Sequence, residues 1–143
     1  LARNLKPDNA LEALLGCTCF NDVTARSLQR TDGVFARAKG FDSFAPCGPW
    51  IETDLVWPEL EVEAWVNGKQ RQHGRLDDLI FGVPEVLSFV SRVMTLEPGD
   101  LIALGTPEGV GPLKAGDEVE IRVSAVGALR NPVIDEGEEG ART

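Results

Sequence analysis

Alternation of apolar and polar positions is clearest over residues 60–68, LEVEAWVNG. A period of two predicts a half-buried strand over 60–66, whose inward positions are Leu60, Val62, Ala64 and Val66. Asn67-Gly68 follows directly and is the strongest short signal for a hairpin turn. KQRQHG, residues 69–74, is therefore predicted as the return strand.

Other apolar runs predict further strands. EVEIRVS, residues 118–124, alternates in the same way. CTCFNDV predicts a buried strand near 17–23, and GPWIET predicts a short strand over 48–53. GDLIALGT carries a nearly continuous apolar run, which predicts a strand over 101–105 that is buried on both faces. GALRNPV, residues 127–133, closes the domain.

Helical spacing is rarer in this chain. Residues 78–94 show the main helical pattern, with Asp77 or Asp78 as its cap and Pro84 at the end or start of a turn. ALEALLG predicts a short helix capped by Asp8 or Asn9 and stopped at Gly16. TARSLQ predicts a helical turn with Thr24 as a candidate cap, and residues 30–45 predict an ordered functional loop.

Composition fits one domain of mainly β (α+β) class. The chain has 143 residues, 43 % apolar, and its 15 Gly and 9 Pro imply many turns. No apolar run approaches the roughly 20 residues of a membrane span, and no signal-peptide pattern is present, so we expect a cytoplasmic protein. A net charge of −9 disfavours nucleic acids and anionic membranes as partners. An acidic substrate would need a metal ion or local Lys and Arg side chains.

Three cysteines, Cys17, Cys19 and Cys47, do not form a disulfide framework. Cys17-x-Cys19 has no second pair, and His73 is the only histidine, which disfavours a four-ligand zinc site. Buried, reduced thiols are the better interpretation. His73 itself falls on an exposed return strand, and no Ser/His/Asp set accompanies it.

The apolar segment LLGCTCF ends on Asn21 and Asp22. A carboxylate at the end of a buried strand can ligate a hard cation such as Mg²⁺ or Mn²⁺. Alternatively, Asp22 caps the following turn, which spacing alone favours because no partner carboxylate is near in sequence.

Basic residues gather after Asp22. Arg26 and Gln29 are three apart and share a face if the turn is helical, and Lys39 lies between Phe35 and Phe41. In an acidic chain this local density suits a carboxylate ligand, although a solvated charged face would look the same.

The last candidate binding segment is GTPEGVGP, residues 105–112. Its glycines permit close backbone approach, and Thr106 stands where a strand is predicted to end, so its hydroxyl or amide could bind an oxyanion. A structural turn is the alternative, and no P-loop lysine is present.

Taken together, these segments resemble the fumarylacetoacetate hydrolase family, in particular its bacterial catechol-pathway members. The matching segments occur in the same order as in the family, from about residue 3 to residue 134. They are NDVTARSLQ, ARAKGFDSFAPCGPWI, VNGKQRQ, DDLIF, VMTLEPGDLIALGTPEGVGPLKAGDEVEI and GALRNPV.

The resemblance implies a mixed-sheet β-roll and a site with one divalent metal, usually Mg²⁺ or Mn²⁺. It implies that Asp22 is a metal ligand, that Gln29 and Lys39 contact substrate oxygens, and that Thr106 binds the substrate carboxylate. Lys39 is the expected catalytic residue. A homodimer is also implied.

Some features depart from the family. Two further ligands in the family come from a Glu-x-Glu pair just upstream of the segment that is Ala2-Arg3-Asn4 here, and an upstream lid supplies His and Glu. Ser27 stands where many members have Asp. We therefore expect residues 1–134 to be the C-terminal major part of a single catalytic domain, 135–143 to be a polar mobile tail, and the natural protein to be longer at its N-terminus.

The implied function is a divalent-metal-dependent enzyme acting on 2-oxo or 2-enol dicarboxylic acids through a metal-stabilised enolate. Our first choice is a 2-hydroxyhepta-2,4-diene-1,7-dioate isomerase/decarboxylase of aromatic catabolism. The alternatives are an acylpyruvate hydrolase or oxaloacetate decarboxylase of the same family, and a non-catalytic domain or fragment that keeps only the fold.

Overall fold

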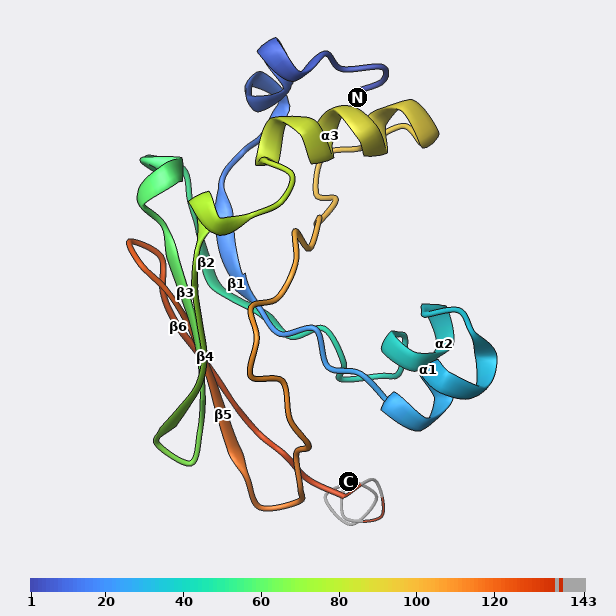
Figure 1. Ribbon diagram of the computed structural model, residues 1–143, viewed down its shortest axis with the longest axis vertical. Helices are drawn as coiled ribbons and strands as arrows, with labels where there is room; N and C mark the ends of the chain where they lie inside the picture. The colour runs from blue at the N-terminus through green and yellow to red at the C-terminus, as the bar shows by residue number, and fades with distance from the viewer. Residues whose placement is uncertain (136, 138–143) are drawn as a thin grey trace.

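Two antiparallel sheets and a few short helices make up the computed structural model, which describes residues 1–135 and 137. A four-stranded sheet has the order β4-β3-β5-β6, and β1 pairs with β2 in a separate two-stranded sheet (Figure 1). The strands are β1 (Cys17–Phe20), β2 (Cys47–Glu52), β3 (Glu61–Val66), β4 (Lys69–Arg75), β5 (Glu118–Val123) and β6 (Gly127–Pro132). The helices are η1 (Pro7–Ala13), α1 (Arg26–Asp32), α2 (Ala36–Lys39), η2 (Trp57–Glu59), η3 (Leu76–Asp78) and α3 (Val83–Val93).

The hairpin of β3 and β4 confirms the prediction from period and turn. Asn67 and Gly68 have φ of 51° and 72°, and the two positive values match the tight turn that Asn-Gly favours. The predicted strands near 17–23, 48–53 and 118–124 are also confirmed. The mainly β (α+β) class therefore holds, and every strand pair in the described part of the chain is antiparallel.

Two apolar clusters hold the elements together. The first lies on the inner face of the large sheet, where Val119, Ile121 and Val123 of β5 meet the fully buried Cys19 and Val126. The second joins η1 to α3 through Ala10, Val83 and Leu87. Burying such side chains is worth roughly 1.5–3 kcal/mol each, so β1 and α3 are both fixed to their surroundings by apolar area.

Burial also determines the state of the thiols. It raises the pKa of Cys17 and of Cys19, which keeps both as protonated, unreactive groups. Cys47 differs from the prediction because it is exposed at the start of β2.

The main helix begins later than predicted. Gly82 is its N-cap and donates its N–H to Glu85 Oε2 at 2.5 Å, while Pro84 lies in the first turn. Asp78 is not the cap because its carboxylate accepts the N–H of Arg75 at 3.1 Å within η3. The helix therefore starts one tight turn after the predicted aspartates, at Val83.

The predicted strand over 101–105 is wrong. These residues form no regular element, and no strand in the described part of the chain pairs with them. Leu101 is 54 % exposed, and only Ile102 and Leu104 pack against the η1–α3 cluster. An apolar run alone thus failed to predict pairing, because a strand needs a neighbour for its backbone hydrogen bonds.

The predicted caps of the first helices also differ. η1 is a 3₁₀ helix whose N-cap is Lys6, and Asn9 accepts the N–H of Lys6 at 3.2 Å. α1 begins after Ala25 rather than at Thr24. Of the expected tail 135–143, Glu136 and 138–143 lie outside the described residues. Across the described residues, every helix is too short or too polar to cross a membrane.

Candidate functional site

The end of β1 brings Asp22 against Lys39. The chain leaves β1 through a turn in which Asn21 donates its N–H to Pro46 O at 3.0 Å. Lys39 is the last residue of α2, and its Nζ donates to Asp22 Oδ2 in an ion pair. The two side chains are 33 % and 38 % exposed, so the pair lies in a shallow position that a small ligand can reach.

Asp22 does not cap the following helix. The N-cap residue of α1 is Ala25, and no side chain satisfies that end of the helix. Thr24 instead donates its hydroxyl to the backbone carbonyl of Asp22 at 3.0 Å. The capping interpretation is therefore wrong. The Asp22 carboxylate contacts the ammonium group of Lys39 instead.

Gln29 lies on α1, in the same two-helix unit. The predicted shared face is confirmed, since Arg26 donates to Gln29 Oε1 at 2.6 Å. This bond uses the amide oxygen and leaves the amide NH₂ of Gln29 to donate to another group. The Lys39 ammonium also lies 5.5 Å from the centroid of the Phe35 ring, as a cation over an aromatic face.

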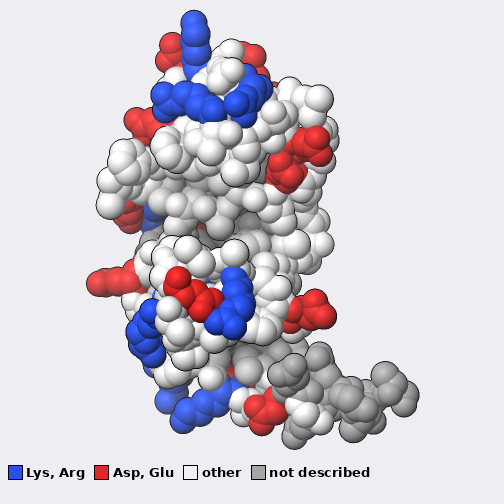
Figure 2. Space-filling view, turned by 90° about the vertical axis from the view of Figure 1, so that its right-hand side faces the viewer, with Lys and Arg blue, Asp and Glu red and all other residues white. Residues whose placement is uncertain are grey.

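Part of the basic segment is structural. Arg37 donates to both carboxylate oxygens of Asp32, at 2.7 and 2.5 Å. These hydrogen bonds lower the pKa of Asp32 and raise that of Arg37. Figure 2 looks onto this side of the molecule, where basic and acidic side chains adjoin near the middle of the face. The ion pair of Arg37 with Asp32 thus joins α2 to the end of α1.

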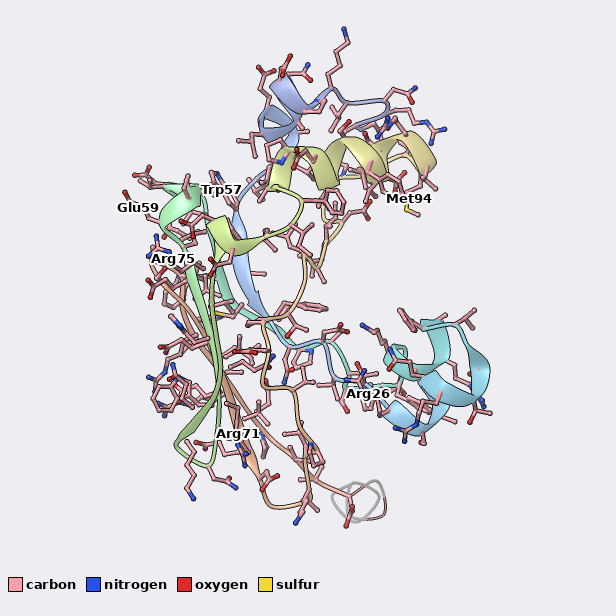
Figure 3. All side chains as sticks on the ribbon, viewed as in Figure 1. Arg26, Trp57, Glu59, Arg71, Arg75 and Met94 are labelled. Atoms are coloured by element: carbon pink, nitrogen blue, oxygen red, sulfur yellow. The ribbon has the colours of Figure 1, made fainter. Side chains whose placement is uncertain are left out.

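Thr106 lies elsewhere, in the extended segment between α3 and β5. Its hydroxyl accepts from Gln72 Nε2 of β4 at 2.8 Å. Within the described residues no hydrogen bond or ion pair joins Thr106 to Asp22, Gln29 or Lys39. In Figure 1 this segment descends between the four-stranded sheet and the α1–α2 pair, and Figure 3 places Arg26 of α1 to the right of it.

Asp22 is the carboxylate that could ligate a metal ion at this position. Across the described residues there is no group of three or more His, Cys, Asp or Glu side chains that could hold a metal. Mg²⁺ often binds proteins through only one or two carboxylates and keeps several waters, so Asp22 fits as a single oxygen ligand. These residues alone do not form a complete protein cage.

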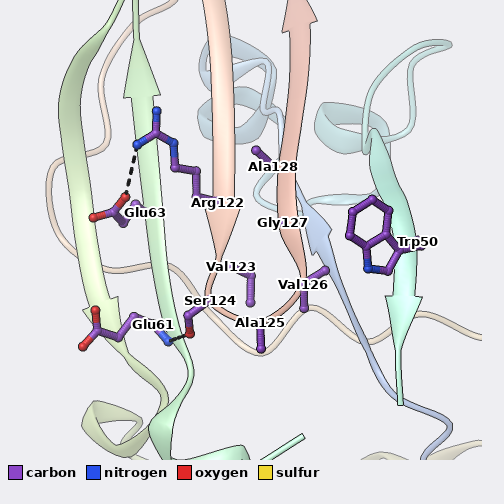
Figure 4. A pocket seen from close by; sticks show the side chains of 10 residues that line it. All are labelled: Trp50, Glu61, Glu63, Arg122, Val123, Ser124, Ala125, Val126, Gly127 and Ala128. Atoms are coloured by element: carbon purple, nitrogen blue, oxygen red, sulfur yellow. Dashed lines mark hydrogen bonds and ion pairs between the residues drawn. The ribbon is translucent and has the colours of Figure 1, made fainter. Parts of the chain in front are cut away.

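A hollow lies on the outer face of the large sheet, between Trp50 and the β5–β6 turn (Figure 4). Its charged side chains are all in ion pairs: Glu63 pairs with Arg122 across the strands, and Glu61 pairs with Arg75. None of the predicted site residues lines it. His73 also falls on this exposed face, with Nε2 3.5 Å from Glu61 Oε2, as the alternation predicted.

Comparisons with known proteins concern the sequence and the fold of the whole chain. The family model "Fumarylacetoacetate (FAA) hydrolase C-terminal" matches residues 1–134. An uncharacterized protein of Methanocaldococcus jannaschii is 49 % identical over 134 residues, which are 94 % of this chain and 56 % of that protein. The crystal structure of 2-hydroxyhepta-2,4-diene-1,7-dioate isomerase from Mycobacterium marinum superimposes with a TM-score of 0.93 at 46 % identity, covering 95 % of this chain and 54 % of that one.

Other relatives carry the names of different reactions. A 4-hydroxyphenylacetate degradation bifunctional isomerase/decarboxylase of Salmonella dublin is 38 % identical over 94 % of this chain and 32 % of its own. An oxaloacetate tautomerase of Bacillus subtilis is 39 % identical over 90 % of this chain and 46 % of its own. Maleylpyruvate hydrolase from Sphingobium sp. SYK-6, in complex with manganese(II) and pyruvate, has a TM-score of 0.84 at 35 % identity, over 93 % of this chain and 49 % of that one.

The chain spans about half the length of most of these relatives. Named relatives are isomerases, decarboxylases, tautomerases and hydrolases, so the shared fold serves more than one reaction. The match to the family model and the likeness of sequence and structure cover nearly the whole chain. The chain therefore belongs to the fumarylacetoacetate hydrolase family.

Proposed function

We propose that this chain is the C-terminal major part of the catalytic domain of a divalent-metal-dependent enzyme for 2-oxo or 2-enol dicarboxylic acids. The observation that carries the proposal is the contact of Asp22 with Lys39, two residues 17 positions apart in sequence. A carboxylate for a hard cation thus lies beside an ammonium for a substrate oxygen. Relatives that act on 2-oxo acids support the substrate class.

Asp22 would be one ligand of Mg²⁺ or Mn²⁺. Such an ion supplies a Lewis acid that stabilises negative charge developing on a substrate oxygen. Water and groups outside the described residues would fill the other positions around the ion. The manganese bound in maleylpyruvate hydrolase supports this choice of metal class.

Lys39 would act as the catalytic cation beside the developing enolate. Its ammonium is held at Asp22 and over Phe35, so its position is fixed before a substrate arrives. A charge fixed in advance stabilises the transition state without reorganising during the reaction.

Gln29 and Thr106 would orient the substrate. Gln29 has its amide NH₂ free to donate to a substrate oxygen, because Arg26 occupies the amide oxygen. Thr106 would donate its hydroxyl to the substrate carboxylate. Donors positioned in advance would hold the reacting bond in one orientation.

The preferred substrate is 2-hydroxyhepta-2,4-diene-1,7-dioate, with isomerisation or decarboxylation as the reaction. The structural likeness to an isomerase of that compound, at 46 % identity, supports this choice over the others. In isomerisation the enol oxygen releases its proton and carbon 5 of the chain takes one up, which converts the 2-hydroxy-2,4-diene into a 2-oxo-3-ene. Decarboxylation would act on a related 2-oxo acid in which the departing carboxylate leaves a carbanion conjugated with the oxo group, so that the electrons of the broken C–C bond pass to the 2-oxo oxygen as CO₂ leaves. A homodimer is part of the same proposal.

Turnover of a panel of 2-oxo acids tests the substrate. The dienedioate, an acylpyruvate and oxaloacetate are each offered with Mn²⁺, to the parent chain and to Lys39→Met. We expect the dienedioate to react fastest and Lys39→Met to lose that activity. An inert dienedioate beside a reactive acylpyruvate would assign the chain to the hydrolase alternative.

A non-catalytic domain is the candidate from another class. The lack of a group of three metal ligands among the described residues favours it. Turnover that depends on Lys39 would exclude it. Absence of turnover together with absence of Asp22-dependent metal binding would favour it.

A further inference from the structure

Gln72 of β4 holds the loop that carries Thr106. Its Nε2 donates to Thr106 Oγ1 at 2.8 Å and to the carbonyl oxygen of Pro107 at 2.6 Å. Both amide hydrogens are therefore used on two consecutive residues of the loop. The side chain is half-buried, while Thr106 itself is exposed.

The Pro107 carbonyl shows which group donates in these two hydrogen bonds. A carbonyl oxygen only accepts, so the Gln72 atom that faces it must be the nitrogen. The same nitrogen faces Thr106, and the hydroxyl oxygen must then accept. Its hydrogen is consequently directed away from Gln72, and the described residues offer it no acceptor.

Backbone packing fixes the same loop against the same strand. A Cβ on Gly109 would lie 2.0 Å from the carbonyl oxygen of Arg71, and Gly109 has a φ of +99° that favours glycine. A Cβ on Gly74 would lie 3.0 Å from Pro107 Cβ. Figure 3 labels Arg71 on this part of the sheet. The loop thus lies on β4 at three neighbouring points, and Gln72 is the polar one.

We propose that Gln72 is a positioning residue that locks the Thr106 side chain in one rotamer and turns its hydroxyl into a hydrogen-bond donor for a carboxylate. A carboxylate ligand only accepts, so a hydroxyl whose lone pair is already engaged presents the complementary group. This inference rests on the proposed role of Thr106 in binding the substrate carboxylate.

The first experiment needs no ligand. The three-bond couplings of the Thr106 methyl carbon to its backbone N and C′ report the χ1 rotamer in the chain as it is. We expect values of a single rotamer in the parent and averaged values in Gln72→Leu. Gln70→Leu is the matched control, because Gln70 lies on the same strand and donates instead to Glu63 at 2.8 Å.

Two results would overturn the inference at this stage. One is an averaged Thr106 rotamer in the parent, and the other is an unchanged single rotamer in Gln72→Leu. The sheet amide spectrum of each variant shows whether it is folded. If Gln72→Leu does not fold, Gln72→Glu replaces it, since that side chain has the same size but cannot donate to Pro107.

The second experiment measures pyruvate binding in the presence of Mn²⁺. We expect Gln72→Leu and Thr106→Val each to weaken binding about ten- to a hundredfold, as loss of a hydrogen bond to a charged group does. The double variant should bind no worse than Thr106→Val, because Gln72 acts through the hydroxyl. Gln72→Glu should weaken binding further than Gln70→Glu, which adds the same charge to the same strand.

The outcomes separate the two proposals. Unchanged binding in Thr106→Val, or a parent that does not bind pyruvate, would contradict the proposed function of Thr106, while the rotamer couplings still decide whether Gln72 positions it. Weakened binding in Thr106→Val with no effect of Gln72→Leu, or with additive effects in the double variant, would overturn the role of Gln72 alone.

Discussion

Replacing Glu120 by Gln removes one charge from the best-connected ionic group on the outer face of the sheet. The Glu120 side chain is only 10 % exposed, and its carboxylate accepts from Arg122 Nε at 2.9 Å. It also accepts from Arg122 NH2 and from Arg130 NH2, both at 3.1 Å. Glutamine has nearly the same shape, but its NH₂ group would have to face a guanidinium donor.

The loss of unfolding free energy in Glu120→Gln follows from these hydrogen bonds and from the exposure of the two arginines. Hydrogen bonds to charged groups are worth about 1.5–3 kcal/mol when buried. Arg122 and Arg130 are 42 % and 61 % exposed, so water screens the interaction. We therefore expect Glu120→Gln to lower the free energy of unfolding by about 1–2 kcal/mol at neutral pH.

The same bonds set the pH dependence. Hydrogen bonding from Arg122, with that from Arg130, lowers the pKa of Glu120 below its ordinary value of 4.5, against the opposing effect of burial. A lowered folded-state pKa means that this stabilisation is complete above the unfolded-state pKa. It is lost as the pH falls through the lowered folded-state value.

Urea unfolding of Glu120→Gln at pH 7 and in acid measures both effects. The gap in unfolding free energy between parent and variant should be present at neutral pH and should close in acid. Glu118→Gln is the control, because Glu118 lies two residues away on the same strand and is exposed. A gap that stays constant in acid, or no gap at pH 7, would refute the reasoning.

Three further changes probe packing and the loop. Ser91→Ala should destabilise the fold by about 1–3 kcal/mol in thermal unfolding, because the fully buried hydroxyl accepts the Leu5 N–H at 3.0 Å; an unchanged melting temperature would contradict this. Leu87→Ala should cost about 2–5 kcal/mol in urea unfolding, since Leu87 is 4 % exposed, and a loss below about 1 kcal/mol would refute its core role. Gly109→Ala should speed amide exchange of the loop, because the new Cβ would meet the Arg71 carbonyl; parent-like exchange would count against the close approach.

Sequence patterns predicted the local parts of this fold well. The β3–β4 hairpin follows from alternation and from Asn67-Gly68, whose positive φ values are intrinsic to those residue types. The helix start was misplaced because Asp78 satisfies a backbone N–H in a tight turn of its own. The strand predicted over 101–105 is absent because an apolar run indicates burial, whereas strand pairing depends on a neighbour that the sequence does not specify. Leu101 is even exposed.

The candidate site was identified in the sequence only through the resemblance to the family. Spacing alone favoured Asp22 as a helix cap, and the contact with Lys39 arises from the packing of α1 on α2, which no local pattern encodes. Gln72 was overlooked, although a signal exists. The hairpin register pairs it with Ala64 on the inner face of the sheet, where a polar side chain needs a partner.

Localising Mn²⁺ on the chain tests the central proposal most directly. Paramagnetic broadening of amide signals during a Mn²⁺ titration detects even a weakly held ion, and Asp22→Ala is compared with Asp54→Ala, which removes an exposed carboxylate outside the α1–α2 unit. The proposal predicts broadening centred on Asp22 and Lys39 that disappears in Asp22→Ala and persists in Asp54→Ala. Broadening spread over other acidic residues and unaffected by Asp22→Ala would contradict it.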